Sequence, residues 1–160
     1  MRIGWSERGA ARQLAAAPRR YRFCAAHRLH ANDLSTEENW AIFGKCNNSN
    51  GHGHNYVLFV SITGEIDPIT HQVVDGRQLD LIVERIIVRR FDHQDLNLDP
   101  AFASQTTTGE NLVRLIWDLL VNEIPTGRLK KVGVIETRDN YFEYSGSLQD
   151  TMKGNEVKYA

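Results

Sequence analysis

Residues 43–56 of this 160-residue chain read FGKCNNSNGHGHNY, and the rest of the sequence can be interpreted around them. The stretch places Cys46 ahead of two histidines, His52 and His54, that are separated by one residue. Alternate side chains of a β-strand point to the same face, so a strand through His52 would bring both imidazoles to one metal ion. His27 lies in an earlier stretch that can pair with this strand. Three histidines leave one position of a tetrahedral Zn²⁺ open, which is typical of a catalytic site.

The composition is that of one ordinary globular domain with room for a sizeable core. Hydrophobic residues make up 41% and charged residues 24%, and the net charge is −1. This balance gives no basic field for nucleic acid and no acidic excess typical of disorder. No apolar run is long enough to span a bilayer, and no stretch resembles a secretory signal. With only two cysteines, Cys24 and Cys46, we expect a cytoplasmic protein with no nucleic-acid or membrane partner.

Residues 1–17 differ from the rest of the chain. They contain Arg2, Arg8 and Arg12 against one acid, Glu7, and end in an alanine-rich run. An Arg-rich, acid-poor segment can be an organelle transit peptide, but the scarcity of serine and the presence of Glu7 favour a poorly ordered extension. We therefore expect an extension over residues 1–17 and one domain over residues 18–160.

Hydrophobic periodicity predicts strands over residues 19–29, 56–66, 130–137 and 141–144, with a short extended piece at 72–75. Apolar residues at helical spacing predict helices over 77–91 and 110–123, and a capping-box spacing from Ser35 to Glu38 predicts a short helical turn. Residues 92–97 read as a polar loop. The order is β-β-α-α-β-β, an α+β fold with two helices on one face of an antiparallel sheet. Because an open sheet has exposed edges, we expect these edges to pair in an oligomer.

Cys46 has two interpretations. It can complete a closed His₃Cys structural zinc site as the fourth ligand. Alternatively, it stays off the metal as a thiolate base, whose ionised form nearby cations would favour. Asp92 and His93 likewise form either an oriented acid/base pair or a helix end in which His93 complements the dipole.

Glu136 lies in an apolar run, where an unpaired carboxylate is costly. It can accept two hydrogen bonds from a planar N–C–N edge, or it can be a structural ion-pair partner. Glu110, near the start of the second helix, is most simply a carboxylate favoured by the helix dipole.

These residues together resemble the 6-pyruvoyltetrahydropterin synthase family. The resemblance runs in order from about Tyr21 to Gly146 and rests on five stretches of the chain, namely 23–29 (FCAAHRL), 43–56, 92–93 (DH), 110–111 (EN) and 134–137 (VIET). It implies a T-fold, in which the sheets of three subunits join into a barrel and two trimers stack as a hexamer with active sites between subunits. It also implies a zinc-dependent carbon–oxygen lyase that acts on a phosphate ester, 7,8-dihydroneopterin triphosphate, and releases triphosphate.

Carried over by position, the resemblance assigns a role to each candidate residue. His27, His52 and His54 match the zinc ligands. Cys46 matches the catalytic thiol, and Asp92 and His93 match the other two members of its triad. Glu136 matches the carboxylate that anchors the pterin, with Thr108 and Glu110 in the same pocket. Gly109 departs from the Thr, Ser or Ala usual in the family, and this removes a side chain beside the ring.

Other functions are also compatible with the sequence. A relative with the same fold, 6-carboxytetrahydropterin synthase of 7-deazaguanine and queuosine biosynthesis, uses the same substrate and zinc site but releases acetaldehyde. Its cysteine typically stands closer to the His-x-His pair, so the spacing from Cys46 to His52 favours the pyruvoyl type, which acts in tetrahydrobiopterin biosynthesis. A non-catalytic zinc or pterin-binding protein and a generic His₃ zinc hydratase are the remaining alternatives.

Overall fold

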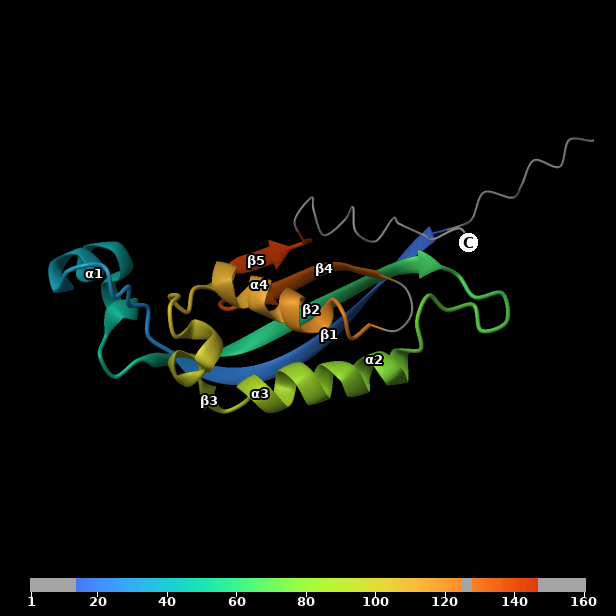
Figure 1. Ribbon diagram of the computed structural model, residues 1–160, viewed down its shortest axis with the longest axis horizontal. Coiled ribbons are helices and arrows are strands. Elements are labelled where there is room, and N and C mark those ends of the chain that lie inside the picture. The colour runs from blue at the N-terminus through green and yellow to red at the C-terminus, as the bar shows by residue number, and fades with distance from the viewer. Residues whose placement is uncertain (1–13, 125–127, 147–160) are drawn as a thin grey trace, which may run out of the picture.

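The computed structural model describes residues 14–124 and 128–146, which fold around one mixed β-sheet (Figure 1). The strands lie in the order β3-β1-β2-β4-β5. Their bounds are Leu14–His27 for β1, His52–Glu65 for β2, Gln94–Asp95 for β3, Arg128–Ile135 for β4 and Tyr141–Tyr144 for β5. Neighbouring strands are antiparallel except that β3 runs parallel to β1. The α+β class is thus confirmed, whereas the expectation of a purely antiparallel sheet was wrong, because β3 lies in the segment expected to be a loop.

The helices lie close to where the sequence places them. The expected helix over 77–91 is α2 (Gly76–Val83), a π-helical turn η2 (Glu84–Val88) and α3 (Arg89–Phe91) in direct succession, and the second expected helix is α4 (Gly109–Leu120). The capping box is present, with Ser35 before α1 (Thr36–Phe43). Short 3₁₀ turns complete the described chain at η1 (Gly44–Asn47), η3 (Leu96–Leu98) and η4 (Pro100–Phe102).

One face of the sheet carries the core. Alternate residues of β1, β2 and β4 point to this face, and the registers that pair Phe23 with Tyr56 and Leu58 with Val134 align them across the strands. They pack against the apolar sides of α2–α3 and α4 in a single buried cluster. The residues on this face include Phe23, Ala25, Tyr56, Leu58, Val60, Ile62, Val132 and Val134. The expected placement of both helices on one face agrees with this burial pattern.

Several expected strand assignments were wrong, including the start of the second strand, which lies at His52 instead of Tyr56. Strand β1 begins at Leu14, inside the expected extension, because Leu14–Pro18 pair with Ser61–Glu65 of β2; residues 1–13 lie outside the described residues. Residues 72–75 are not part of a strand, and residues 73–74 form a bend. Strand β4 ends at Ile135, so Glu136 follows the strand instead of lying within it.

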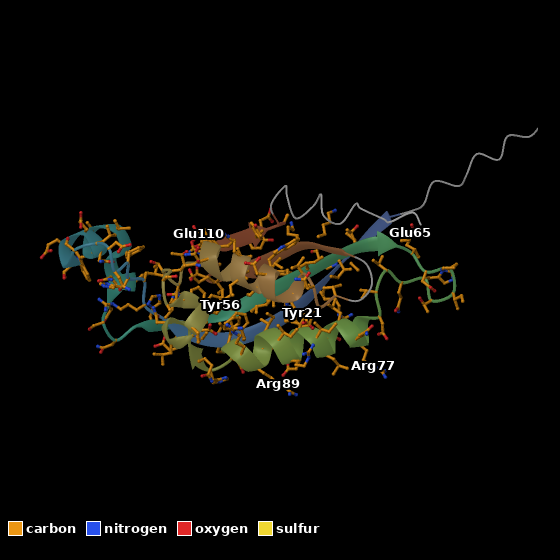
Figure 2. All side chains as sticks on the ribbon, in the orientation of Figure 1. Tyr21, Tyr56, Glu65, Arg77, Arg89 and Glu110 are labelled. Carbon is orange, nitrogen blue, oxygen red and sulfur yellow. The ribbon has the colours of Figure 1, made fainter. Side chains whose placement is uncertain are left out.

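Helix α1 lies at one end of the sheet, away from α2–α3 and α4 (Figure 1). Asn39 holds the loop before it, since the buried side-chain amide accepts the Ala31 N–H at 2.8 Å and donates to the carbonyls of Ala31, Leu34 and Ser35. Figure 2 shows Tyr56 and Glu110 toward this end of the sheet and Glu65 at the opposite end. Within residues 14–124 and 128–146, no helix has the length and apolar character needed to cross a membrane.

Candidate active site

Three histidines converge at the end of the sheet that faces α1. His27 ends β1, directly opposite His52, which begins β2, and His54 follows on the same face. One ring nitrogen from each of the three lies within 4.8 Å of the others, and His27 Nε2 is 3.1 Å from His52 Nε2. Among the described residues, no other histidine, cysteine or carboxylate belongs to this cluster. The cluster can therefore hold a metal ion, and Cys46 is not part of it.

Gly51 permits the close approach of the two strands at this point. Its φ is +67°, in the left-handed region that glycine adopts most readily, and a Cβ at this position would lie 3.0 Å from the carbonyl oxygen of His27. A side chain here would push β2 away from β1 just before His52. The glycine next to His52 in the sequence thus favours the close approach of the strands that brings His52 beside His27.

The protein fixes the orientation of the His27 imidazole. His27 Nδ1 lies 2.8 Å from the carbonyl oxygen of Thr107, and a carbonyl only accepts, so Nδ1 carries the proton. The lone pair of Nε2 then faces His52 and Glu136. Burial lowers the pKa of His27, partly offset by the Thr107 carbonyl and by Glu136, and burial likewise lowers the pKa of His54. Both histidines are thus held in the neutral form that binds metals.

The spacing of the His27 and His52 ring nitrogens is compatible with a bound zinc ion. Zn–N bonds of about 2.0–2.1 Å in a tetrahedron separate the ligand nitrogens by about 3.3 Å, close to the 3.1 Å between His27 and His52. The Nδ1 atom of His52 is buried without a hydrogen-bond partner within the part of the chain that the structure describes. The nitrogen of His52 that faces His27 is Nε2, so a metal ion between the two rings would bind Nε2 and leave the proton of His52 on Nδ1.

Glu136 lies at the edge of the histidine cluster. Its Oε1 is 3.6 Å from His27 Nε2 and 3.9 Å from His54 Nε2, and it accepts a hydrogen bond from the Tyr56 hydroxyl at 3.4 Å. The carboxylate is 11% exposed, so it can still receive a ligand. Burial, together with the nearby Glu136, raises the pKa of Tyr56, which stays a hydrogen-bond donor at neutral pH. The site therefore combines a metal-binding cluster with one adjacent, accessible carboxylate.

Asp92 and His93 form the hydrogen-bonded pair expected from the sequence. Asp92 Oδ2 lies 2.9 Å from His93 Nδ1, while Oδ1 accepts the Cys24 N–H at 2.8 Å. The Cys24 N–H, and next the bond to His93, lower the pKa of the Asp92 carboxyl. His93 has a left-handed φ of 58°, uncommon for a residue with a side chain, and its N–H donates to the Cys24 carbonyl at 2.6 Å. The pair is thus anchored to the edge of β1, with the imidazole of His93 mostly exposed.

The cavity beside His93 does not contain Cys46. It measures about 410 Å³, and its lining includes Cys24, His54, Asn55 and His93. Cys46 lies in η1, where its carbonyl accepts the Leu29 N–H at 2.9 Å. The described part of one chain thus brings the three histidines and Glu136 together, and separately brings Asp92 to His93, without uniting Cys46 with that pair in one cavity.

Thr108 and Glu110 lie at the beginning of α4. Thr108 is the N-cap residue, and its Oγ1 accepts the Asn111 N–H at 3.4 Å. Glu110 is exposed in the first turn, where a carboxylate complements the helix dipole.

Two features of the site were missed from the sequence. The Thr107 carbonyl, which orients His27, is a main-chain atom, and no residue type marks such a role. Cys24 was read only as a strand residue, yet its backbone holds both Asp92 and His93, and its Sγ contacts Asn55 Oδ1 at 2.9 Å. The sequence does not show that β1 and the end of α3 lie next to each other in the fold, and this role of Cys24 depends on that contact.

Comparison with known proteins gives a consistent family. The family model described as 6-pyruvoyl tetrahydropterin synthase matches residues 17–147. The 6-pyruvoyl tetrahydrobiopterin synthase of Homo sapiens is 46% identical over 142 residues, covering 88% of this chain and 98% of that protein. The Drosophila melanogaster protein of the same name is 41% identical over 130 residues, covering 80% of this chain and 77% of that protein.

A solved structure gives the same assignment. The Caenorhabditis elegans 6-pyruvoyl tetrahydropterin synthase superimposes with a TM-score of 0.81 at 39% identity, covering 85% of this chain and 98% of that one. The residues matched by the family model include every candidate site residue. The chain therefore belongs to the 6-pyruvoyl tetrahydropterin synthase family.

Proposed function

We propose that this protein is a zinc-dependent 6-pyruvoyltetrahydropterin synthase that converts 7,8-dihydroneopterin triphosphate to 6-pyruvoyltetrahydropterin and triphosphate. The observation that carries the proposal is the cluster of His27, His52 and His54 with Glu136 at its edge. Membership of the family and 46% identity to the human synthase support the same activity. The reaction needs no external oxidant, because the carbon–oxygen bond to triphosphate breaks while the side chain rearranges to a diketone.

The three histidines would hold the zinc ion, which when bound polarises the side-chain hydroxyls and acidifies the neighbouring C–H bonds. Glu136 would accept hydrogen bonds from the N–C–N edge of the pterin, with Thr108 and Glu110 contributing to the same pocket. Glu136 Oε1 lies 3.6 and 3.9 Å from two histidine nitrogens, so a ring bound to Glu136 would lie next to the cluster with its side chain within reach of the metal ion. Anchoring the ring in this way would hold the pterin side chain in a fixed position relative to the metal ion, so the enzyme and its substrate would be preorganised for the reaction.

Cys46 and His93 would transfer the protons. Asp92 fixes the proton of His93 on Nδ1, so Nε2 is the nitrogen free to accept a proton from substrate. Cys46 would act as the thiolate base. Because the cavity beside His93 is not lined by Cys46, we infer that Asp92 and His93 serve the site of a neighbouring copy of the chain.

The free edges of the sheet support this assembly. Strand β3 pairs with β1 only at Ala25 and Ala26, so the outer edge of β1 before Ala25 has no partner strand among the described residues. Such an edge is a template for a strand of another copy. We propose a homohexamer of two stacked trimers, with each active site between subunits.

Product analysis tests the function. Zinc-loaded protein incubated with 7,8-dihydroneopterin triphosphate is expected to release one equivalent of triphosphate and to give the mass of 6-pyruvoyltetrahydropterin. A 6-carboxytetrahydropterin product with acetaldehyde would instead assign the alternative synthase, and intact substrate would indicate a non-catalytic binding protein. Either result overturns the proposal.

The two cysteines supply a matched pair of variants. Cys46→Ser is expected to lose at least about 100-fold in kcat, as typical for loss of an acid/base group. Cys24→Ser is expected to stay within about threefold of wild type, because a serine hydroxyl can still donate to Asn55 Oδ1. Equal effects of the two substitutions would contradict the role given to Cys46.

A further inference from the structure

The beginning of α4 reaches the histidine cluster through the main chain of Thr107. Thr107 is 1% exposed, and its carbonyl lies 2.8 Å from His27 Nδ1. Its Oγ1 donates to the Arg28 carbonyl at 3.1 Å, which ties the segment to the end of β1. The position of the carbonyl that orients His27 therefore depends on where the segment before α4 lies.

This segment moves with the helix, because hydrogen bonds connect the two. Asn111, in the first turn of α4, donates from Nδ2 to the Thr106 carbonyl at 2.8 Å. Thr108 caps the helix through the Asn111 N–H. A displacement of the first turn of α4 would therefore displace Thr107 and its carbonyl.

The first turn of α4 packs against β5 through a glycine. Gly109 is buried, and a Cβ at this position would overlap ring atoms of Phe142. Phe142 is half-buried, packs against the core cluster and pairs with Val134 across β4 and β5. The ring of Phe142 thus occupies the space that a side chain at position 109 would need.

We propose that Gly109 and Phe142 form a size-matched pair that sets the position of the Thr107 carbonyl and so holds His27 Nε2 in place for the metal ion. Both are positioning residues, since they act through Thr107 and not by contact with the metal. The proposal rests on the metal-binding role given to His27. A side chain larger than glycine at 109 moves the helix start away from Phe142, and the bond that fixes the His27 tautomer lengthens or breaks.

Reciprocal substitution tests the pair. In the full chain, zinc affinity measured by competition with a chromophoric chelator is expected to fall about 10- to 100-fold in Gly109→Thr, as is typical when a partner of a metal ligand is lost. The double variant Gly109→Thr/Phe142→Val makes room for the new side chain and is expected to recover to within about threefold of wild type. Wild-type affinity in Gly109→Thr, or no recovery in the double variant, would overturn the proposal.

A milder pair of variants remains informative if Gly109→Thr does not fold. Gly133 is a second glycine whose Cβ would overlap an aromatic side chain, that of Tyr141 on β5. Gly109→Ala is expected to weaken zinc binding, whereas Gly133→Ala is expected to leave it within about threefold of wild type. An equal loss in both variants would mean that crowding beside β5 acts through general stability, contrary to the proposal.

The His27 tautomer gives a readout without metal or turnover. A long-range ¹H–¹⁵N correlation spectrum of the metal-free protein is expected to show the Nδ1–H tautomer in wild type and in the double variant. A mixture of tautomers is expected in Gly109→Ala. If the wild-type protein does not bind zinc, the proposed function is refuted, and this spectrum still tests whether Gly109 and Phe142 position His27. If the spectrum of Gly109→Ala is the same as that of wild type, only the positioning proposal is refuted.

Discussion

Substitution of Asp92 by asparagine is expected to reverse the tautomer of His93. The carboxylate has two bonds to the protein, from the Cys24 N–H to Oδ1 at 2.8 Å and from His93 Nδ1 to Oδ2 at 2.9 Å. The Cys24 N–H can only donate, so the amide oxygen of the substituted side chain must take the place of Oδ1. The amide nitrogen then faces His93 Nδ1 and donates to it. This moves the His93 proton to Nε2, the atom that is proposed to accept a proton from substrate.

The expected loss in kcat follows from the loss of His93 as a general base. A wrongly protonated imidazole cannot act in its step, and removal of a general base typically costs about 10²- to 10⁴-fold in rate, or about 3–5 kcal/mol of transition-state stabilisation. The zinc content and KM of Asp92→Asn are expected to stay within about threefold of wild type, because no bond to the histidine cluster or to Glu136 changes.

Steady-state release of triphosphate by the zinc-loaded protein measures kcat and KM together. Asp33→Asn, which removes an exposed carboxylate in the loop before α1, is the matched control and is expected to behave as wild type. Size-exclusion chromatography checks that the assembly is retained. A kcat for Asp92→Asn close to that of wild type, or a loss confined to KM, would refute the assignment of Asp92 and His93 as an oriented base.

Three further results are expected for stability and metal binding. Asn39→Ala removes a buried amide that makes four hydrogen bonds around the loop before α1, so the free energy of unfolding measured in urea should fall by about 3 kcal/mol. The exposed control Asn122→Ala should lose less than about 0.5 kcal/mol. Equal losses in the two variants would contradict the role of Asn39. Ser35→Ala removes the capping box of α1 and should cost about 1 kcal/mol in the same assay, and no change would argue against that cap. Burial lowers the pKa of His27 and His54, so the unfolded metal-free chain binds more protons than the folded chain just below pH ~6.5. The thermal unfolding midpoint of the metal-free protein should therefore fall as the pH drops through this range. A midpoint that stays constant or rises as the pH drops would contradict this sign.

The strand pattern carried most of what the sequence could predict about the site. A period of two residues places His52 and His54 on the same face as Tyr56, and the same alternation places His27 on the apolar side of β1. These assignments depend only on local geometry, so they did not require knowledge of the fold. The capping box at Ser35 was predictable for the same reason.

The errors occurred where tertiary contacts determine local structure. Gln94 and Asp95 form a strand of two residues that shows no periodicity and exists only because it lies beside Ala25 and Ala26. Leu14 begins β1 because β2 extends far enough to pair with it. Both features depend on a partner distant in sequence, which a reading of local pattern cannot supply.

The same limit applies to the supporting contacts of the site. The Thr107 carbonyl has no side-chain signature, and the absence of a side chain at Gly109 is explained only by Phe142 from β5. The sequence predicted the residues that are proposed to touch metal and substrate, but not those that hold them in position. Positioning depends on the distance between elements, and this is known only from the folded chain.

The central claim is that three imidazoles bind one zinc ion while the sulfur of Cys46 stays unbound. X-ray absorption at the zinc edge measures this directly on the full-length protein. The expected spectrum is that of nitrogen and oxygen ligands at about 2.0–2.1 Å, three of them imidazoles, with His52→Ala losing the bound ion. A sulfur ligand at about 2.3 Å in the wild-type protein would contradict the account, because Cys46 would then close the metal site and could not act as a base.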